Sequence, residues 1–259
     1  MNLSSALLKP IDTPETEVDM ALSILDRVAG SAGSVTIAQI CDDLGLPRER
    51  GSRIIYMLAR RKMLICLDDR VALGRRPARW GIAALQVEHL TAVAEPVMHD
   101  LNRETGFNAA LFVFEPPHVV CIKHVGLIEY ENGPRLGTPF NAYRVASGRA
   151  ILACLPERFL TDYISAYHLD MSAAKVEADI VLPVARAREV GYAISESHLQ
   201  CDVVSAACPV LSGQAEPIAA ISLWRASYSC THDMIREALP TLREAAAELS
   251  RLLGARKYL

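Results

Sequence analysis

The strongest chemical signal in the sequence is a block of basic side chains between Pro47 and Arg79. Ten basic residues stand there against three acidic ones, so the block has a formal charge of +7 in a chain of net charge −3. The ten are Arg48, Arg50, Arg53, Arg60, Arg61, Lys62, Arg70, Arg75, Arg76 and Arg79. A basic region in an otherwise acidic chain indicates a polyanionic partner that meets this region only, although a solvated helix face would carry the same charges.

Three short helices are predicted before and within this block. Residues 18–28 carry apolar side chains at helical spacing. Their expected inward face is Val18, Ala21, Leu22, Ile24, Leu25 and Val28. Thr36 is a suitable N-cap for a second helix, and Pro47 suits the first turn of a third helix that runs to about Lys62 and turns its early arginines outward.

The second and third predicted helices have the spacing of a helix-turn-helix. Cys41 is a small residue where two steeply crossing helices touch, and Gly45 tolerates the positive φ of a tight turn. Gly51 departs from the pattern, because this position is usually aliphatic and glycine weakens a helix by about 0.5–1 kcal/mol relative to alanine. Residues 63–67 and 71–73 are then predicted strands of a hairpin, or wing.

The remainder of the chain alternates helices and strands. Two helices are predicted from about Trp80 to Val93 and from Pro96 to Thr105. The later predicted strands are 109–114, 119–125, 191–194, 205–211 and 218–223, and the later helices are 143–155, 156–167, 175–190 and 231–253. Strands flanked by helices predict an α+β domain with a central antiparallel sheet.

Several classes of protein are disfavoured. No apolar run reaches the roughly 18 residues that span a bilayer, and the first ten residues lack the basic start of a signal peptide. The seven cysteines are scattered and odd in number, which is typical of reduced thiols in a cytoplasmic protein. GxSxG, GxGxxG, P-loop and HExxH motifs are absent, and the histidines show no metal-ligand spacing. We therefore expect no catalytic residue, metal or cofactor.

Short motifs along nearly the whole chain resemble the IclR family of bacterial transcription regulators. In the first part they are Ala-Leu-Ser-Ile-Leu-Asp at 21–26, Thr-Ile-Ala-Gln-Ile at 36–40, and Gly-Leu-Pro at 45–47 followed by Arg-Ile-Ile at 53–55. In the distal part they are Ala-Ser-Gly-Arg-Ala at 146–150, Val-Gly-Tyr-Ala at 190–193 and Ile-Ala-Ala-Ile-Ser at 218–222. Each motif alone is weak, but their order and spacing together are specific.

The resemblance implies an α+β architecture with three parts. These are an N-terminal winged helix-turn-helix over 14–75, a linker helix over 76–93 that helps dimerisation, and a C-terminal GAF-like effector-binding domain over 94–259. It also implies a cytoplasmic regulator, expected to repress a catabolic operon, that acts as a homodimer or homotetramer without a membrane. Its partners would be a duplex DNA operator and a small organic or aromatic acid.

On this interpretation the third helix enters the major groove with its N-terminal turns first. Arg48 and Arg50 are expected at base edges, because arginine can bind guanine O6 and N7 together, and Arg53 is expected at a phosphate. The predicted DNA-binding residues are Thr36, Gln39, Arg48, Arg50, Ser52, Arg53 and Arg70. Thr36 can equally be a plain N-cap, and the basic residues at 60–62 a solvated helix end.

The resemblance also places an effector pocket between the sheet and a covering helix. The backbone N–H groups of Ala146 and Ser147 begin that helix and suit a carboxylate, while Trp224 either stacks on a ring or shrinks the cavity. The predicted effector-binding residues are Tyr130, Arg144, Ala146, Ser147, Ser195, Cys208, Ser222 and Trp224. Ser195 stands where acid-sensing relatives can carry Asp, and Val204 or Ser205 where they can carry Cys, so a glyoxylate-like effector is not expected.

Two other functions stay open at this stage. One is an enzyme that acts on a small carboxylate through the C-terminal pocket, with Cys208 or Ser222 as nucleophile and His198 as its base. The other is a thiol-based redox sensor that depends on Cys201 or Cys208. Neither is indicated by a sequence motif.

Overall fold

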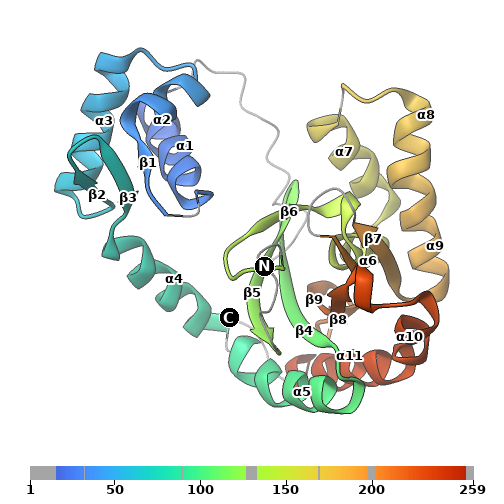
Figure 1. Ribbon diagram of the computed structural model, residues 1–259. Helices are drawn as coiled ribbons and strands as arrows, with labels where there is room; N and C mark the ends of the chain where they lie inside the picture. Colours follow the sequence, from blue (N-terminus) through green and yellow to red (C-terminus); the bar gives the residue numbers. More distant parts are fainter. Residues whose placement is uncertain are drawn as a thin grey trace. The chain divides into compact units, whose positions relative to one another are not determined.

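The computed structural model describes residues 16–31, 33–88, 90–126, 133–168, 170–197 and 202–254 (Figure 1). Contacts divide the chain into two compact units, the first within Ile11–Glu88 and the second within His89–Leu259. Among the described residues, the first unit has one hydrophobic core and the second has two. Among the described helices, none combines the length and the apolar character needed to cross a membrane.

The described part of the first unit has the predicted winged helix-turn-helix. Its elements are α1 (Glu17–Ala29), β1 (Val35–Thr36), α2 (Ile37–Asp43), α3 (Arg48–Arg60), β2 (Leu64–Leu67), β3 (Arg70–Leu73) and α4 (Arg75–Glu88). The strands form an antiparallel sheet in the order β1-β3-β2, so β1 extends the predicted hairpin by one strand. The sequence did not predict β1, because two residues cannot display a period-2 pattern.

Helix α1 turns a narrower stripe inward than its sequence suggests. Met20, Ile24 and Val28 are buried at a spacing of four residues. Val18 and Leu22 were expected inward, but they are 68% and 55% exposed. Each lies two residues from the buried stripe, which is about 200° around an α-helix. The prediction was therefore wrong for these two side chains.

The close crossing of α2 and α3 explains the glycine in α3. Gly51 is buried, and a Cβ at this position would lie 2.5 Å from the Sγ atom of Cys41. Close-packed interiors leave no room for such an atom. The sulfur of Cys41 thus fills the space that an aliphatic side chain at position 51 would otherwise take. Gly45, with φ 63°, makes the turn between the two helices as predicted.

The helices around residue 90 differ from their predicted bounds. Helix α4 starts at Arg75 rather than near Trp80, and α5 (Leu90–Thr105) passes through Pro96 without ending. A proline inside a helix removes a hydrogen bond, so it normally marks a helix start. Here the buried face of α5, which includes Ala94, Met98 and Leu101, holds the helix together through packing.

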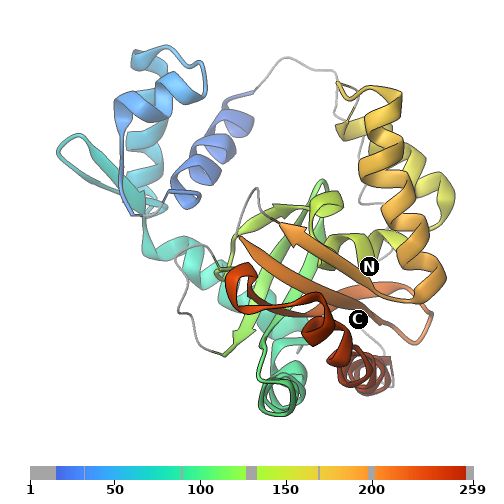
Figure 2. The same cartoon turned by 45° about the vertical axis from the view of Figure 1, so that its right-hand side comes forward.

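The second unit is built on a six-stranded antiparallel sheet in the order β6-β5-β4-β9-β8-β7, as far as its described residues show (Figures 1 and 2). The prediction of an α+β fold with a central antiparallel sheet is confirmed. Beyond α5, the elements of this unit are β4 (Asn108–Glu115), β5 (His118–Val125), β6 (Pro139–Asn141), η2 (Ala142–Arg144), α6 (Ala146–Cys154), α7 (Glu157–Tyr167), α8 (Ala173–Val176), η3 (Glu177–Val181), α9 (Leu182–Val190), β7 (Ala193–Ser197), β8 (Val203–Leu211), β9 (Pro217–Ala226), η4 (Ser227–Ser229), α10 (His232–Glu237) and α11 (Leu239–Gly254).

Side-chain alternation along the strands separates two cores. Ala207 and Trp224 face the core that contains α6, α7 and α9. Cys208 and Ile221, which are adjacent in register, face the core that contains α5 and α11. Figure 1 shows α5 and α11 side by side, in agreement with their contacts. Successive residues of a strand point to opposite faces, so a shift of one position decides which core a side chain enters.

Two long predicted helices are subdivided in the structure. The predicted helix 231–253 is α10 followed by α11, with Ala238 between them and Pro240 in the first turn of α11, where a missing N–H costs nothing. The predicted helix 175–190 is α8, the π-helical turn η3 and α9, and it ends at Gly191 with φ 79°. Strand β6 was not predicted, because it is only three residues long.

Candidate functional sites

Helix α3 separates its apolar and basic side chains onto different faces. Ile54 and Ile55 are buried, whereas Arg48, Arg50 and Arg53 are exposed. At 100° per residue, Arg53 lies near the middle of the exposed face, while Arg48 and Arg50 lie near its two borders. The three predicted arginines therefore share the exposed surface at the start of one helix.

The α3 arginines differ in their neighbours. Arg53 forms an ion pair with Glu17 of α1, and the Nη2 atom of Arg48 lies 3.7 Å from an Asp42 carboxylate oxygen. Among the described residues, Arg50 has no ion-pair partner. Exposed ion pairs are worth about 0–1 kcal/mol. A phosphate group could therefore compete for Arg48 and Arg53 at little energetic cost.

Thr36 and Gln39 form a capping box at the start of α2. The Thr36 Oγ1 atom accepts a hydrogen bond from the Gln39 backbone N–H at 3.2 Å, and the Thr36 N–H donates to Gln39 Oε1 at 3.0 Å. This arrangement satisfies two backbone donors and fixes the start of the helix. Both side chains thus have a structural role at the place where DNA contacts were predicted.

The wing places Arg70 beside this helix start. Its Nη1 atom donates to Ser34 Oγ at 3.2 Å, and Arg70 pairs in register with Thr36 across β1 and β3. Ser52 is half-buried on α3. Tyr56, which was not predicted, is 54% exposed one helical turn after Ser52 and Arg53. The sequence signal for Tyr56 was an aromatic residue on the outward face of a basic helix, one turn after Arg53.

The second unit contains a small pocket on the α6 face of the sheet, which we call the Trp224 pocket. Its volume is about 40 Å³. The lining residues are Phe112, Pro134, Phe140, Val145, Ser147, Val203, Ser205, Ser222 and Trp224. Of the predicted residues, it brings together Ser147, Ser222 and Trp224. None of the described lining side chains is charged, so those that the structure shows offer hydroxyls, backbone dipoles and aromatic faces.

The start of α6 faces this pocket without a side-chain cap. Its N-cap residue Val145 makes no capping hydrogen bond, and both Val145 and Ser147 line the pocket. Gly148 lets this helix approach η2, because a Cβ there would lie 2.1 Å from the Ala142 carbonyl oxygen. The uncapped N–H groups of a helix start attract carboxylates and other acceptors.

Trp224 is the largest described side chain that lines the pocket. It is 2% exposed, and its Nε1 atom has no hydrogen-bond partner in the described structure. His124 lies beside it, with ring centroids 5.6 Å apart and its own Nε2 also unpartnered. An indole N–H usually finds an acceptor when it is buried. This donor is therefore a candidate contact for a bound molecule.

Three other predicted residues lie near the pocket without lining it. Ser195 is buried and donates from Oγ to the Arg144 carbonyl at 2.9 Å, which ties β7 to η2. Arg144 donates from Nε to the Tyr143 hydroxyl at 2.9 Å. Ala146 is buried in the core beneath the start of α6. Tyr130 lies outside the described residues.

Cys208 does not belong to the pocket. It is one residue out of phase with Ser205 and Ala207, so its side chain enters the core on the α5 and α11 face. Burial also raises the pKa of its thiol to about 12. Of the two alternatives left open by the sequence, Ser205 lines the pocket and Val204 enters the opposite core. Six described lining residues were not predicted as effector-binding: Phe112, Pro134, Phe140, Val145, Val203 and Ser205.

Comparison with known proteins identifies the family. Residues 82–251 match the family described as bacterial transcriptional regulator IclR, C-terminal. The chain is 24% identical over 246 residues to the transcriptional repressor IclR of Escherichia coli (strain K12), and the match covers 90% of this chain and 88% of that protein.

Solved structures share the fold over nearly the whole chain. An IclR family transcriptional regulator from Brucella abortus has a TM-score of 0.76 at 20% identity, covering 91% of this chain and 92% of that one. An IclR homolog from Microbacterium hydrocarbonoxydans, complexed with 4-hydroxybenzoate, has a TM-score of 0.72 at 20% identity, covering 93% and 100%. The chain belongs to the IclR family of bacterial transcriptional regulators.

Proposed function

We propose that this regulator binds a duplex DNA operator through α3, represses a catabolic operon, and responds to a small organic or aromatic acid in the Trp224 pocket. The observation that carries the proposal is the set of exposed arginines at the start of α3, within a helix-turn-helix that is followed by a wing. The second helix of such a motif is the one that enters the major groove.

The individual contacts follow from the neighbours of each side chain. Arg50 has no ion-pair partner among the described residues and would bind a base edge, as would Arg48 once released from Asp42. Arg53 would exchange Glu17 for a phosphate. The capping box of Thr36 and Gln39 would hold the start of α2 against the DNA backbone, with Ser52 and Arg70 adding contacts on either side.

An aromatic acid suits the groups around the Trp224 pocket. Its carboxylate would accept from the uncapped start of α6, and its ring would pack on Phe112 and Phe140, which lie 6.0 Å apart between centroids. The pocket of about 40 Å³ is far smaller than the roughly 300–1,000 Å³ of typical ligand sites. Binding would therefore displace the Trp224 side chain, and only a ligand that favours one arrangement over the other can regulate DNA binding.

Association of two or four copies is part of the proposal. Trp80 and Ile82 on α4 are 55% and 59% exposed, and they supply an apolar surface for a second copy. A two-fold dimer would present two α3 helices to the two halves of an operator. We retain the division into 14–75, 76–93 and 94–259, in which 76–93 combines most of α4 with the start of α5. The six described cysteines are unpaired, which suits the cytoplasm.

The two alternatives lack support in the described residues. The thiol of Cys208 has a raised pKa and lies away from the pocket, so it is poorly suited to redox sensing or nucleophilic attack. The Ser222 hydroxyl donates to the Ala110 carbonyl at 3.4 Å, and no histidine is among the described residues that line the pocket. His198 and Cys201 lie outside the described residues.

The chain contains two tryptophans, which makes the effector site directly testable. In a Trp80→Phe variant, fluorescence reports on Trp224 alone. We expect benzoate-type acids to change this emission with a saturable dose dependence, and the same acids to change operator affinity over the same concentrations. The effector assignment would be contradicted if the protein binds operator DNA but no organic acid tested changes the emission of Trp224.

A further inference from the structure

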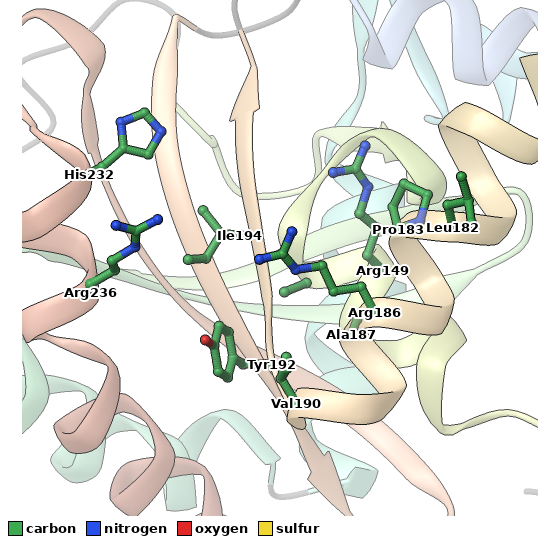
Figure 3. Close-up of a pocket in the computed structure, with 11 residues that line it drawn as sticks. Arg149, Leu182, Pro183, Arg186, Ala187, Val190, Tyr192, Ile194, His232 and Arg236 are labelled. Atoms are coloured by element: carbon green, nitrogen blue, oxygen red, sulfur yellow. The ribbon is translucent and has the colours of Figure 1, made fainter.

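We propose that the second unit carries another ligand site, distinct from the Trp224 pocket, which binds a small organic anion with at least two negative charges. The site is the cleft across the open edge of β7, between α9 and α10, and we call it the β7 cleft. Figure 3 shows its lining residues, which come from α6, α9, β7, α10 and the segment before β7.

The cleft has the size of a small-molecule site. Its volume is about 450 Å³, compared with about 40 Å³ for the Trp224 pocket. Strand β7 is the last strand of the sheet and pairs only with β8 in the described structure, so its other edge is open along the cleft. Ligand sites in proteins are typically concavities of roughly 300–1,000 Å³.

Three arginines from three helices line this cleft, and no acidic residue is among the lining residues that the structure describes. They are Arg149 of α6, Arg186 of α9 and Arg236 of α10, with His232 beside Arg236. Guanidinium groups gathered around one space create a positive potential there. Arginine binds carboxylates and phosphates through paired hydrogen bonds, so several arginines around one space suit a polyanion.

The arginines are available to a ligand to different degrees. Arg149 donates from Nε to the Tyr143 carbonyl at 2.7 Å, which fixes the side chain while its two Nη groups have no hydrogen-bond partner in the described structure. Burial lowers the pKa of Arg149, and Asp179 opposes this shift from a distance beyond ion-pair contact. Arg236 lies 3.8 Å from Asp233, in a solvent-exposed pair. Such a pair is weak enough for a ligand to replace.

A second arginine on α9 shows what a structural role looks like. Arg188 donates from Nε to the Ala153 carbonyl and from Nη2 to the Leu155 carbonyl, both at 2.9 Å, and so ties α9 to the end of α6. Arg186, two residues earlier, makes no such bond within the described structure. Figure 3 shows its guanidinium directed toward β7 and Ile194. The fold thus accounts for Arg188 and leaves Arg186 unexplained.

Apolar groups in the same cleft favour an organic anion over an inorganic ion. Leu182, Pro183, Val190 and Ile194 line it together with Tyr192. A carbon skeleton can pack on these side chains while its charged groups meet the arginines. Among the described residues, the Trp224 pocket shares no lining residue with the cleft and has no cationic side chain. A dicarboxylate or tricarboxylate therefore matches the cleft and not the pocket.

Calorimetric titration of the full-length protein with succinate and citrate tests the site, with neutral succinamide as the uncharged control. We expect both anions to bind and succinamide not to bind. Arg186→Gln and Arg236→Gln should each weaken binding roughly tenfold, the change that corresponds to one hydrogen bond to a charged group, and the double variant more. Arg251→Gln on α11, an exposed arginine outside the cleft, should leave binding unchanged.

Arg186 and Arg236 are exposed, so the melting temperature of each glutamine variant should stay within a degree or two of the wild type. Operator binding and the Trp224 fluorescence response should also be unchanged in the double variant, which separates failure of this site from failure of the proposed function. The inference is overturned if neither anion binds, if succinamide binds equally, or if the double variant binds citrate as tightly as the wild type does.

Discussion

The α3 surface and the Trp224 pocket place their chemistry in opposite ways. The α3 side chains come from one helix and project into solvent, with the helix fixed by a separate apolar face. The pocket side chains come from β4, β6, α6, β8 and β9, and several of them also form the core of the second unit. A substitution on α3 can therefore change binding alone, whereas one in the pocket changes binding and stability together.

The largest expected effect is on Trp224. Replacing Trp224 by Ala should destabilise the second unit by about 3–5 kcal/mol, the usual cost of removing a buried tryptophan. Chemical denaturation measures this change. Leu136→Ala, at a side chain that is 64% exposed in the same unit, should change the free energy of unfolding by less than about 0.5 kcal/mol. Equal costs for the two variants would mean that Trp224 does not stabilise the second unit.

Arg50→Ala should show the reverse pattern. We expect a loss of about 1–3 kcal/mol in operator binding if the side chain reads a base, with stability altered by less than about 0.5 kcal/mol. Gel-shift titration and thermal melting measure the two quantities. The stabilisation of the protein by its acid effector should persist. The matched control is Arg103→Ala, which also removes one positive charge. Arg103 lies on α5 of the second unit, where it pairs with Asp100, so this substitution should leave operator binding unchanged.

The contact between Gly51 and Cys41 allows a test within the first unit. Gly51→Ala should destabilise this unit by about 1–3 kcal/mol through overpacking, despite the better helix propensity of alanine. In a Cys41→Ala background the same substitution should cost much less, because the sulfur that the new Cβ meets is gone. A double-mutant cycle measures the coupling. A coupling energy near zero would mean that the sulfur does not limit position 51.

The smallest expected effect is a difference in pH dependence between the units. Burial lowers the pKa of His124 and of His168, where His118 and Arg144 act in the same direction and Asp170 against it. The unfolded chain then takes up protons first, at about pH 6.5, so the second unit should lose stability as pH falls below that value and be unaffected above it. Residues 11–88 contain no histidine, and the first unit should not share this dependence.

Thermal melts of each unit at pH 7.5 and pH 5.5 would measure the effect, with His168→Phe as the matched variant. His168 packs against Tyr143 and Tyr163, with ring centroids 4.8 and 5.0 Å away, so a phenyl ring can occupy its place. We expect this variant to reduce the pH dependence of the second unit. If the variant has the same pH dependence as the wild type, His168 is not the source of that dependence.

The contrast also explains how far the sequence could predict the sites. The exposure of Arg48, Arg50 and Arg53 follows from the helical period alone, and so does the basic face of α3. Predicting the pocket residues, in contrast, required the phase of each strand and the contacts between elements that are distant in sequence. Ser222 and Trp224 were identified from the family resemblance. Cys208 was also predicted to bind the effector, but one residue of strand phase places it in the core on the opposite face. The arginines of the β7 cleft lie on separate helices and have no signature in sequence.

The fold was more predictable than its details. The helix-turn-helix, the wing and the antiparallel sheet follow from periodicity, caps and turns. The short strands β1 and β6, the passage of α5 through Pro96 and the division of the last helix at Ala238 all depend on tertiary packing. Gly51 is the clearest case, because its reason lies in the sulfur atom of a neighbouring helix rather than in the helix that contains it.

The most direct test of the central claim is the salt dependence of binding to duplex DNA from the region of its own gene. If the α3 arginines meet phosphates and bases, log affinity should fall linearly with log salt concentration, with a slope of about 0.9 for each phosphate neutralised. Arg53→Gln should lower the magnitude of that slope by about one for each bound copy. The account would be contradicted if the affinity for duplex DNA does not change with salt concentration, or if the slope is the same in the Arg53→Gln variant as in the wild type.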